Sequence, residues 1–86
     1  MKVFFYGSAL EYTNNQKLYE PNECASVQEL ITKLNDQFGE RFKDFLLGEE
    51  NCFFLVNGTG LMMTGGLNTK LKAGDKIEIL PFADAG

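Results

Sequence analysis

The sequence has 86 residues, enough for one domain with a modest hydrophobic core. Hydrophobic residues make up 44% of it and charged residues 23%, a composition that favours a folded chain over a disordered one. The formal net charge is -4 and no basic run is present, so the positive surface that binds nucleic-acid phosphates or anionic lipids is missing. The expected partners are therefore proteins with basic patches, with no nucleic acid and no membrane among them.

Hydropathy and cysteine content limit the cellular location of the protein and the kinds of site that it can form. No apolar stretch approaches the roughly 20 residues that span a bilayer, and residues 1–10 lack the length and cleavage pattern of a signal peptide. We expect a cytoplasmic protein. Cys24 and Cys52, without any histidine, cannot supply a four-ligand zinc site or a Cys–His catalytic pair, so we expect buried reduced thiols, no metal and no bound cofactor.

Two strands are expected in the first quarter of the chain. Residues 2–6 are β-branched and aromatic, and Gly7 and Ser8 end the run. Residues 16–20 alternate weakly in polarity before Pro21, which predicts a second strand. The polar residues 12–15 between the two runs predict a hairpin connection.

A helix over residues 27–38 is the clearest predicted element. Its apolar side chains share one face at helical spacing: Val27, Leu30, Ile31, Leu34 and Phe38. Ser26 is the expected N-cap, Glu29 completes a capping box, and Gly39 is expected to end the helix. Burial contributes roughly 1.5 to 3 kcal/mol per side chain, so this helix is expected to be the main filler of the core.

The second half of the chain predicts a turn of helix or an irregular segment packed against the sheet edge, followed by three strands. Residues 42–47 have helical spacing, whereas residues 52–56 form an uninterrupted apolar strand whose two faces are either covered or used for binding. Residues 61–63 predict a short edge strand. Residues 76–80 predict the last strand, which ends at Pro81 because proline cannot donate the next ladder hydrogen bond.

The predicted order is strand, strand, helix, strand, short strand, strand. It indicates an α+β domain in which a mixed sheet of four to five strands packs on one main helix. The first and last strands are both apolar and are expected to be central, parallel neighbours. This arrangement is the β-grasp, or ubiquitin-like, fold. We assign residues 1–81 to the β-grasp domain and residues 82–86 to a flexible C-terminal tail.

The residue types in the sequence do not form a recognisable catalytic site, so we expect no autonomous catalytic activity. Histidine is absent, and Ser8 and Ser26 have no partner base in the sequence. The glycines between positions 58 and 66 are not followed by the Gly-Lys-Ser/Thr of a phosphate loop, and the acidic residues lack the spacing of a calcium loop. These glycines are interpreted as turn residues and the carboxylates as a solvated surface.

The end of the sequence is its unusual feature. After Phe82 come Ala83, Asp84, Ala85 and Gly86, which bury little and so offset little of the roughly 1 to 2 kcal/mol per residue that ordering a backbone costs. The carboxylate of Gly86, with an ordinary pKa of about 3.5, is ionised at neutral pH. Such a narrow tail can enter an enzyme channel, where the carboxylate attacks an activated phosphate. A frayed end without function is the alternative that composition leaves open.

The sequence resembles the MoaD/ThiS family of sulfur carriers over its whole length. The resemblance is carried by Lys2–Tyr6, by the helix Val27–Phe38, by Val56–Gly58 and above all by Gly66–Pro81. The family comprises the small subunit of molybdopterin synthase and the carrier for thiamine thiazole. The length of this chain suits the molybdopterin branch better than the shorter thiamine carriers.

The resemblance implies that an E1-like adenylating enzyme uses ATP to activate the carboxylate of Gly86, which a sulfur donor converts to a thiocarboxylate. The chain is then a cosubstrate or small subunit of a molybdopterin-synthase-like sulfurtransferase. Its sulfur acceptor is the large subunit of molybdopterin synthase or an equivalent protein. The expected partner-binding residues are the tail residues Phe82, Ala83, Asp84 and Ala85, with Phe4, Phe54 and Leu80 on the outer sheet face.

One residue departs from the family pattern. Ala85 stands where the family normally has glycine, and a methyl group added to a channel shaped around glycine costs roughly 1 to 3 kcal/mol. That cost slows activation about tenfold to a hundredfold, or directs the chain to a matched enzyme. Three alternatives therefore stay open: a carrier for thiamine or another sulfur pathway, a β-grasp interaction module with an idle tail, and a modifier joined to lysines through Gly86.

Overall fold

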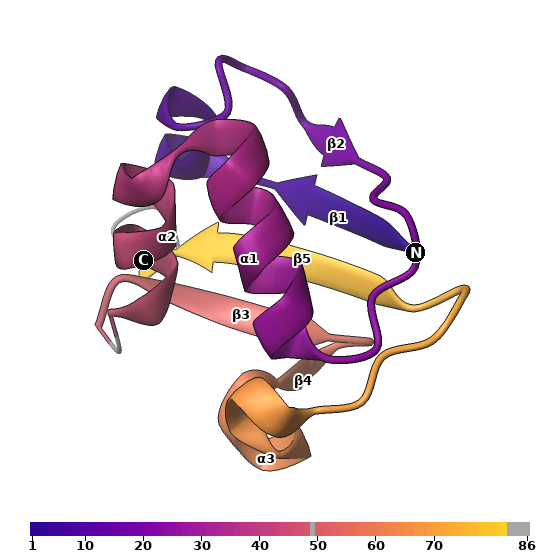
Figure 1. Ribbon diagram of the computed structural model, residues 1–86. Coiled ribbons are helices and arrows are strands. Elements are labelled where there is room, and N and C mark those ends of the chain that lie inside the picture. The colour runs from indigo at the N-terminus through magenta and orange to yellow at the C-terminus, as the bar shows by residue number, and fades with distance from the viewer. Residues whose placement is uncertain (49, 83–86) are drawn as a thin grey trace.

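The computed structural model describes residues 1–48 and 50–82. Their strands form one five-stranded sheet in the order β2-β1-β5-β3-β4, with the two longer helices on one face (Figure 1). The strands are β1 (Lys2–Phe5), β2 (Leu18–Tyr19), β3 (Cys52–Val56), β4 (Thr59–Gly60) and β5 (Lys76–Pro81). The helices are α1 (Val27–Phe38), α2 (Glu40–Leu47) and the short α3 (Leu61–Thr64), with 3-10 turns η1 (Gly7–Glu11) and η2 (Gly66–Asn68).

The first and last strands are parallel neighbours in the middle of the sheet, as predicted. Val3 pairs with Ile77 and Phe5 with Ile79, and these four side chains are almost completely buried. β2 and β3 flank the central pair in antiparallel orientation. The α+β class and the β-grasp arrangement are therefore confirmed.

The helix α1 begins and ends where the sequence predicts. The hydroxyl of Ser26 accepts the backbone N–H of Glu29 at 3.2 Å, and the carboxylate of Glu29 accepts the N–H of Ala25 at 3.1 Å. At the other end Gly39 has φ = 103°, a conformation that residues with a Cβ rarely adopt, and its N–H donates to Asn35 O. Both caps fix the helix in register over the sheet.

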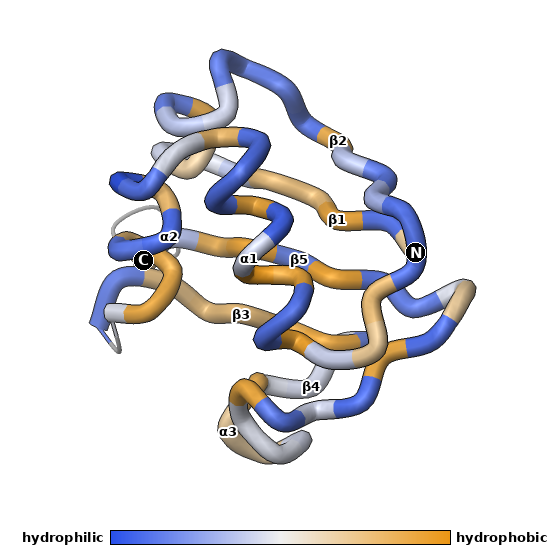
Figure 2. The backbone as a smooth tube through the Cα atoms, viewed as in Figure 1, coloured by the Kyte–Doolittle hydropathy of each residue, from blue (hydrophilic) through white to orange (hydrophobic). Residues whose placement is uncertain are grey.

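One face of the sheet and the inner face of α1 enclose the core. Figure 2 shows hydrophobic residues along β1, β5 and β3, and hydrophobic residues interspersed with hydrophilic ones along α1. Leu30 and Leu34 of α1 are fully buried, and the α2 residue Phe42 closes the core at one end. The ring of Phe42 lies edge-on to Phe5, with 5.6 Å between centroids. These contacts bury 16 hydrophobic residues in one cluster, which is the core a domain of this size needs.

Residues 61–63 were predicted to be an edge strand, and this prediction is wrong. Asn57 and Gly58 form a tight turn with positive φ at both residues, and the returning strand β4 is only two residues long. Leu61, Met62 and Met63 then enter the helix α3, whose C-cap is Gly65. Leucine and methionine favour helix over strand, and glycines on both sides allow the chain to leave the sheet.

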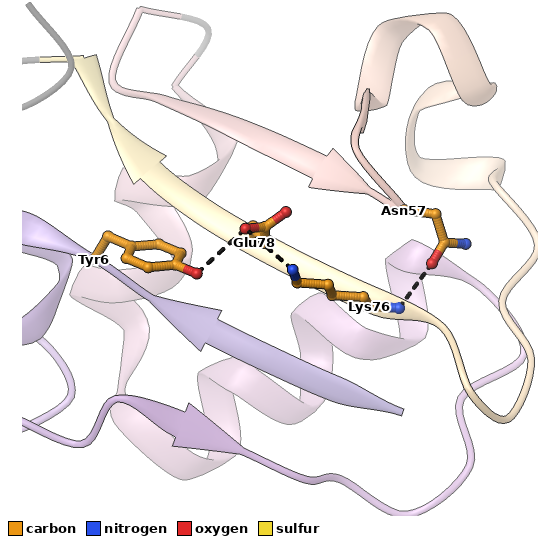
Figure 3. Close-up of polar contacts among 4 residues, drawn as sticks. All are labelled: Tyr6, Asn57, Lys76 and Glu78. Carbon is orange, nitrogen blue, oxygen red and sulfur yellow. Dashed lines mark hydrogen bonds and ion pairs between the residues drawn. The ribbon is translucent and has the colours of Figure 1, made fainter.

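A buried carboxylate joins the turn before β5 to the turn after β3. Asp75, 5% exposed, accepts the side-chain N–H of Asn57 at 3.0 Å and the backbone N–H of Lys72 at 2.8 Å. The side-chain oxygen of Asn57 accepts the N–H of Lys76 at 2.9 Å (Figure 3). The hydrogen bond from Asn57, with that from Lys72, lowers the pKa of Asp75 below its ordinary value of 3.8.

The variant Asp75→Asn tests this junction. Because the folded-state pKa is lowered, the carboxylate stabilises the fold above pH 3.8, and the stabilisation is lost as the pH falls through the lowered pKa. We expect a cost of about 1 to 3 kcal/mol at neutral pH, measured by urea unfolding. The difference between the two proteins should shrink as the pH is lowered past the wild-type pKa, and a constant difference would contradict the assignment.

Candidate functional site

The end of β5 is the best anchored part of the candidate site. Pro81, the last strand residue, is buried and pairs with Cys52. The ladder continues for one more bond, because the N–H of Phe82 donates to Asn51 O at 3.0 Å. Asn51 is itself held by its side chain, which donates to Phe45 O at 3.0 Å. The backbone is therefore fixed to the sheet up to Phe82.

The side chain of Phe82 rests on the outer face of the sheet. Its ring lies 4.4 Å from the ring of Phe53, centroid to centroid, at an interplanar angle of 59°. Phe82 remains 38% exposed and Phe53 48% exposed. Two large aromatic side chains that keep this much exposed surface form the start of an apolar contact area at the base of the expected tail.

Of the three sheet residues predicted to lie on the outer face, two lie there and one lies in the core. Phe4 and Leu80 are half-buried there, opposite the core residues Val3 and Ile79, as predicted. Phe54 does not lie there: it is 6% exposed and belongs to the core. The outer position next to Leu80 is occupied instead by Phe53, its partner in the β3–β5 pairing.

Sequence reasoning missed Phe53 although a signal was present. The run from Cys52 to Val56 is apolar at every position, so hydropathy alone does not say which side chains point inward. Cysteine is among the most buried residue types, and strand alternation places residues two apart on one face. A buried Cys52 therefore assigns Phe54 and Val56 to the core and Phe53 to the outer face, which is the observed pattern.

The outer face also carries a polar cluster beside the aromatic one. The hydroxyl of Tyr6 donates to Glu78 at 3.2 Å, and the ammonium of Lys76 lies 3.8 Å from the same carboxylate (Figure 3). Lys76 also lies over the ring of Phe4, at 5.4 Å from its centroid. Partial burial and then the hydrogen bond to Glu78 raise the pKa of Tyr6, so its hydroxyl stays a donor at neutral pH.

An apolar groove of about 480 Å³ runs along β3 between the end of α2 and α3, and we call it the β3-edge groove. Its lining includes the most exposed large apolar side chains of the described chain, Met62 and Met63, which are 81% and 83% exposed. Phe53 and Phe82 also line it. The groove and the aromatic pair thus form one continuous apolar surface.

The two cysteines do not offer a reactive sulfur. Both are free and buried, and burial raises the pKa of Cys52 to about 11. Burial also raises the pKa of Cys24, against the opposing effect of Lys33. Both thiols are therefore protonated at neutral pH, and a protonated thiol is a poor nucleophile and metal ligand.

Residues 1–48 and 50–82 hold neither a metal-binding cluster nor a membrane-spanning helix. No three acidic, cysteine or histidine side chains among them lie close enough to hold a metal ion. None of their helices is both long and apolar enough to cross a membrane. The expected site residues Ala83, Asp84, Ala85 and Gly86 lie outside the described residues.

The Phe53–Phe82 contact can be measured by a double-mutant cycle. Aromatic pairs of this geometry contribute about 0.5 to 1.5 kcal/mol beyond their burial, so the Phe53→Ala and Phe82→Ala effects on unfolding free energy should be non-additive by that amount. Phe4→Ala combined with Phe82→Ala serves as the control pair and should be additive. Additivity of both pairs would show that the rings are not coupled in solution.

Comparisons with known proteins agree with this geometry. A model of the ThiS family matches residues 3–84. The Amycolatopsis orientalis BexX/CysO complex contains a chain that is 27% identical, with a TM-score of 0.78 and coverage of 93% of this chain and 92% of that chain. A chain in the complex of subunits 1 and 2 of molybdopterin-converting factor from Helicobacter pylori is 26% identical, with a TM-score of 0.63 and coverage of 93% and 89%.

Mycobacterium tuberculosis CysO shares the fold at 21% identity, with a TM-score of 0.81 and coverage of 93% of this chain and 96% of that chain. A search of curated protein sequences found no match. The family match spans nearly the whole sequence, from β1 to beyond the last described residue. With the β-grasp sheet already established, the chain belongs to the ThiS family, a family of ubiquitin-fold sulfur carriers.

Proposed function

We propose that this chain carries sulfur as a thiocarboxylate on Gly86. The observation that supports this most strongly is the family match over residues 3–84. The last strand is anchored to the sheet up to Phe82, and the residues after it, Ala83 to Gly86, are small or acidic. Both side-chain thiols are buried and protonated. Their burial supports assigning the proposed sulfur chemistry to the carboxylate of Gly86 and not to a cysteine.

The chemistry takes two steps on another protein. The carboxylate oxygen of Gly86 attacks the α-phosphorus of ATP on an E1-like enzyme, pyrophosphate leaves, and an acyl adenylate forms. A sulfur nucleophile then attacks the acyl carbon; with hydrosulfide as the simplest donor, AMP and one proton are released and the thiocarboxylate remains. Ala83 and Ala85 keep the tail narrow. Because the reaction consumes ATP, which is available inside cells, we place this function in the cytoplasm.

The molybdopterin pathway is the first candidate for the sulfur acceptor. Subunit 1 of the Helicobacter pylori molybdopterin-converting factor is solved in complex with subunit 2, and a chain of that complex resembles this one at 26% identity. By analogy, the acceptor would be a molybdopterin synthase large subunit. It would dock against Phe82 and the outer-face residues Phe4, Phe53 and Leu80, while the residues from 83 to 86 enter its active site.

A second acceptor is favoured by an observation of equal weight. The 27% identical chain occurs in a complex of CysO with BexX, a differently named partner. The alanine at position 85, where the family normally has glycine, fits a carrier with its own matched enzyme.

Reconstitution tests the carrier function. Incubation with the cognate activating enzyme, ATP and hydrosulfide should add to the intact mass the difference of one oxygen-to-sulfur exchange. Deletion of Gly86 should abolish the change, whereas Gln28→Glu, on the solvent face of α1, should leave it intact. A mass change that survives the deletion would overturn the proposal, and lysine-linked conjugates in place of the thiocarboxylate would identify a protein modifier.

Position 85 gives a separate test of the match between tail and enzyme. If the activating enzyme has a channel shaped around glycine, Ala85→Gly should raise the adenylation rate by about tenfold or more, because it removes a methyl group worth roughly 1 to 3 kcal/mol. If the enzyme is matched to alanine, the rate should stay within about twofold. Pyrophosphate release measures it, and a strong loss of rate would show that the methyl group is itself recognised.

A further inference from the structure

The first half of β3 is an open sheet edge. β4 pairs only with Leu55 and Val56, so within residues 1–48 and 50–82 no strand lies beside Cys52–Phe54 on that side. Figure 1 shows the same asymmetry, with β4 and α3 gathered beside the second half of β3. An open edge presents backbone hydrogen-bonding groups to any extended chain that reaches it.

The ladder to β5 identifies which groups face this edge. The N–H of Phe82 donates to Asn51 O, and the N–H of Asn57 donates to Lys76 O. In an antiparallel pair the bonded residues alternate, so the odd-numbered residues of β3 bond to β5. The backbone groups of Cys52 and Phe54 therefore point the other way, toward the open edge.

The β3-edge groove lies along this same segment and has a distinct chemistry. Among residues 1–48 and 50–82, the side chains that line it carry no charge, and most of them are apolar. They include Cys52, Phe53, Phe54, Met62, Met63 and Phe82. A charged side chain buried there would find no partner of opposite sign, so the groove favours an uncharged, apolar occupant.

The chain's own tail does not fit this description. Asp84 and the carboxylate of Gly86 would bring two negative charges into a groove whose described lining offers no cation. Phe82, by contrast, lines the groove and is also the base from which the tail leaves the sheet. Whatever protein receives the tail is therefore brought next to the groove.

We propose that an extended, uncharged segment of the activating enzyme adds to the edge of β3 beside Cys52–Phe54 and places apolar side chains in the β3-edge groove. The inference rests on the proposed carrier function. Backbone bonds to the strand edge supply affinity, and the groove selects side chains. Met62 and Met63, unbranched and almost fully exposed, adapt their shape to the side chains they meet.

Two charge-matched variants test the groove. Met62→Glu with Met63→Glu adds two negative charges to its wall, and Gln28→Glu with Gln37→Glu adds the same charge to the solvent face of α1. With the cognate activating enzyme and ATP, we expect the first variant to raise KM for the carrier by about tenfold or more with kcat nearly unchanged, and the second to leave both within about twofold. Met62→Leu with Met63→Leu should retain nearly wild-type KM.

Hydrogen exchange on the wild-type complex supplies the second readout. The amide of Phe54 should become protected when the activating enzyme binds, whereas that of Tyr19, on the opposite side of the sheet, should not change. Suppose that the wild type is adenylated. If KM of the Met62→Glu/Met63→Glu variant is then unchanged, or if the Phe54 amide gains no protection, the groove inference is overturned while the carrier function stands. If the wild type is not adenylated, the carrier function fails and the inference fails with it.

Discussion

The parallel pairing of β1 with β5 is the contact on which the rest of the structure depends. It joins the first strand of the chain to the last, and the side chains of Val3, Phe5, Ile77 and Ile79 on its inner face are at most 2% exposed. Parallel strands require a long crossover, and α1 supplies it while covering the inner face of the pair. Because β5 is held on both sides, by β1 and β3, the backbone near the end of the chain is as firmly placed as the core itself.

Under the proposed carrier function, this constraint explains how the domain presents a reactive chain end to another protein. The conformational cost of fixing Pro81 and Phe82 is offset within the fold, so a partner that binds here does not have to order these two residues. The apolar surface lies around the same point, with Phe53, Leu80 and Phe82 on the outer face and the β3-edge groove beside them. Anchoring and docking are therefore properties of one corner of the sheet.

The elements predicted best from the sequence were those with redundant local signals. The helix α1 had an apolar stripe, a capping box and a terminal glycine, and the structure confirms all three. The central, parallel pairing of the first and last strands followed from the apolar character of residues 2–6 and 76–80. Where hydropathy was ambiguous, prediction failed: every position from Cys52 to Val56 is apolar, and Phe54 was assigned to the outer face although it lies in the core. The helix α3, which borders the groove, follows a strand β4 of only two residues. The apolar character of Leu61–Met63 did not reveal where the chain leaves the sheet.

The central claim is that β5 delivers the carboxylate of Gly86 into the nucleotide site of another protein. A crystal structure of the chain bound to its activating enzyme with a non-hydrolysable ATP analogue tests this most directly. We predict that the β1–β5 pair and the Phe82–Asn51 bond are unchanged and that the Gly86 carboxylate lies within contact distance of the α-phosphate. A complex in which the enzyme binds another face and the carboxylate lies away from the nucleotide would contradict the account.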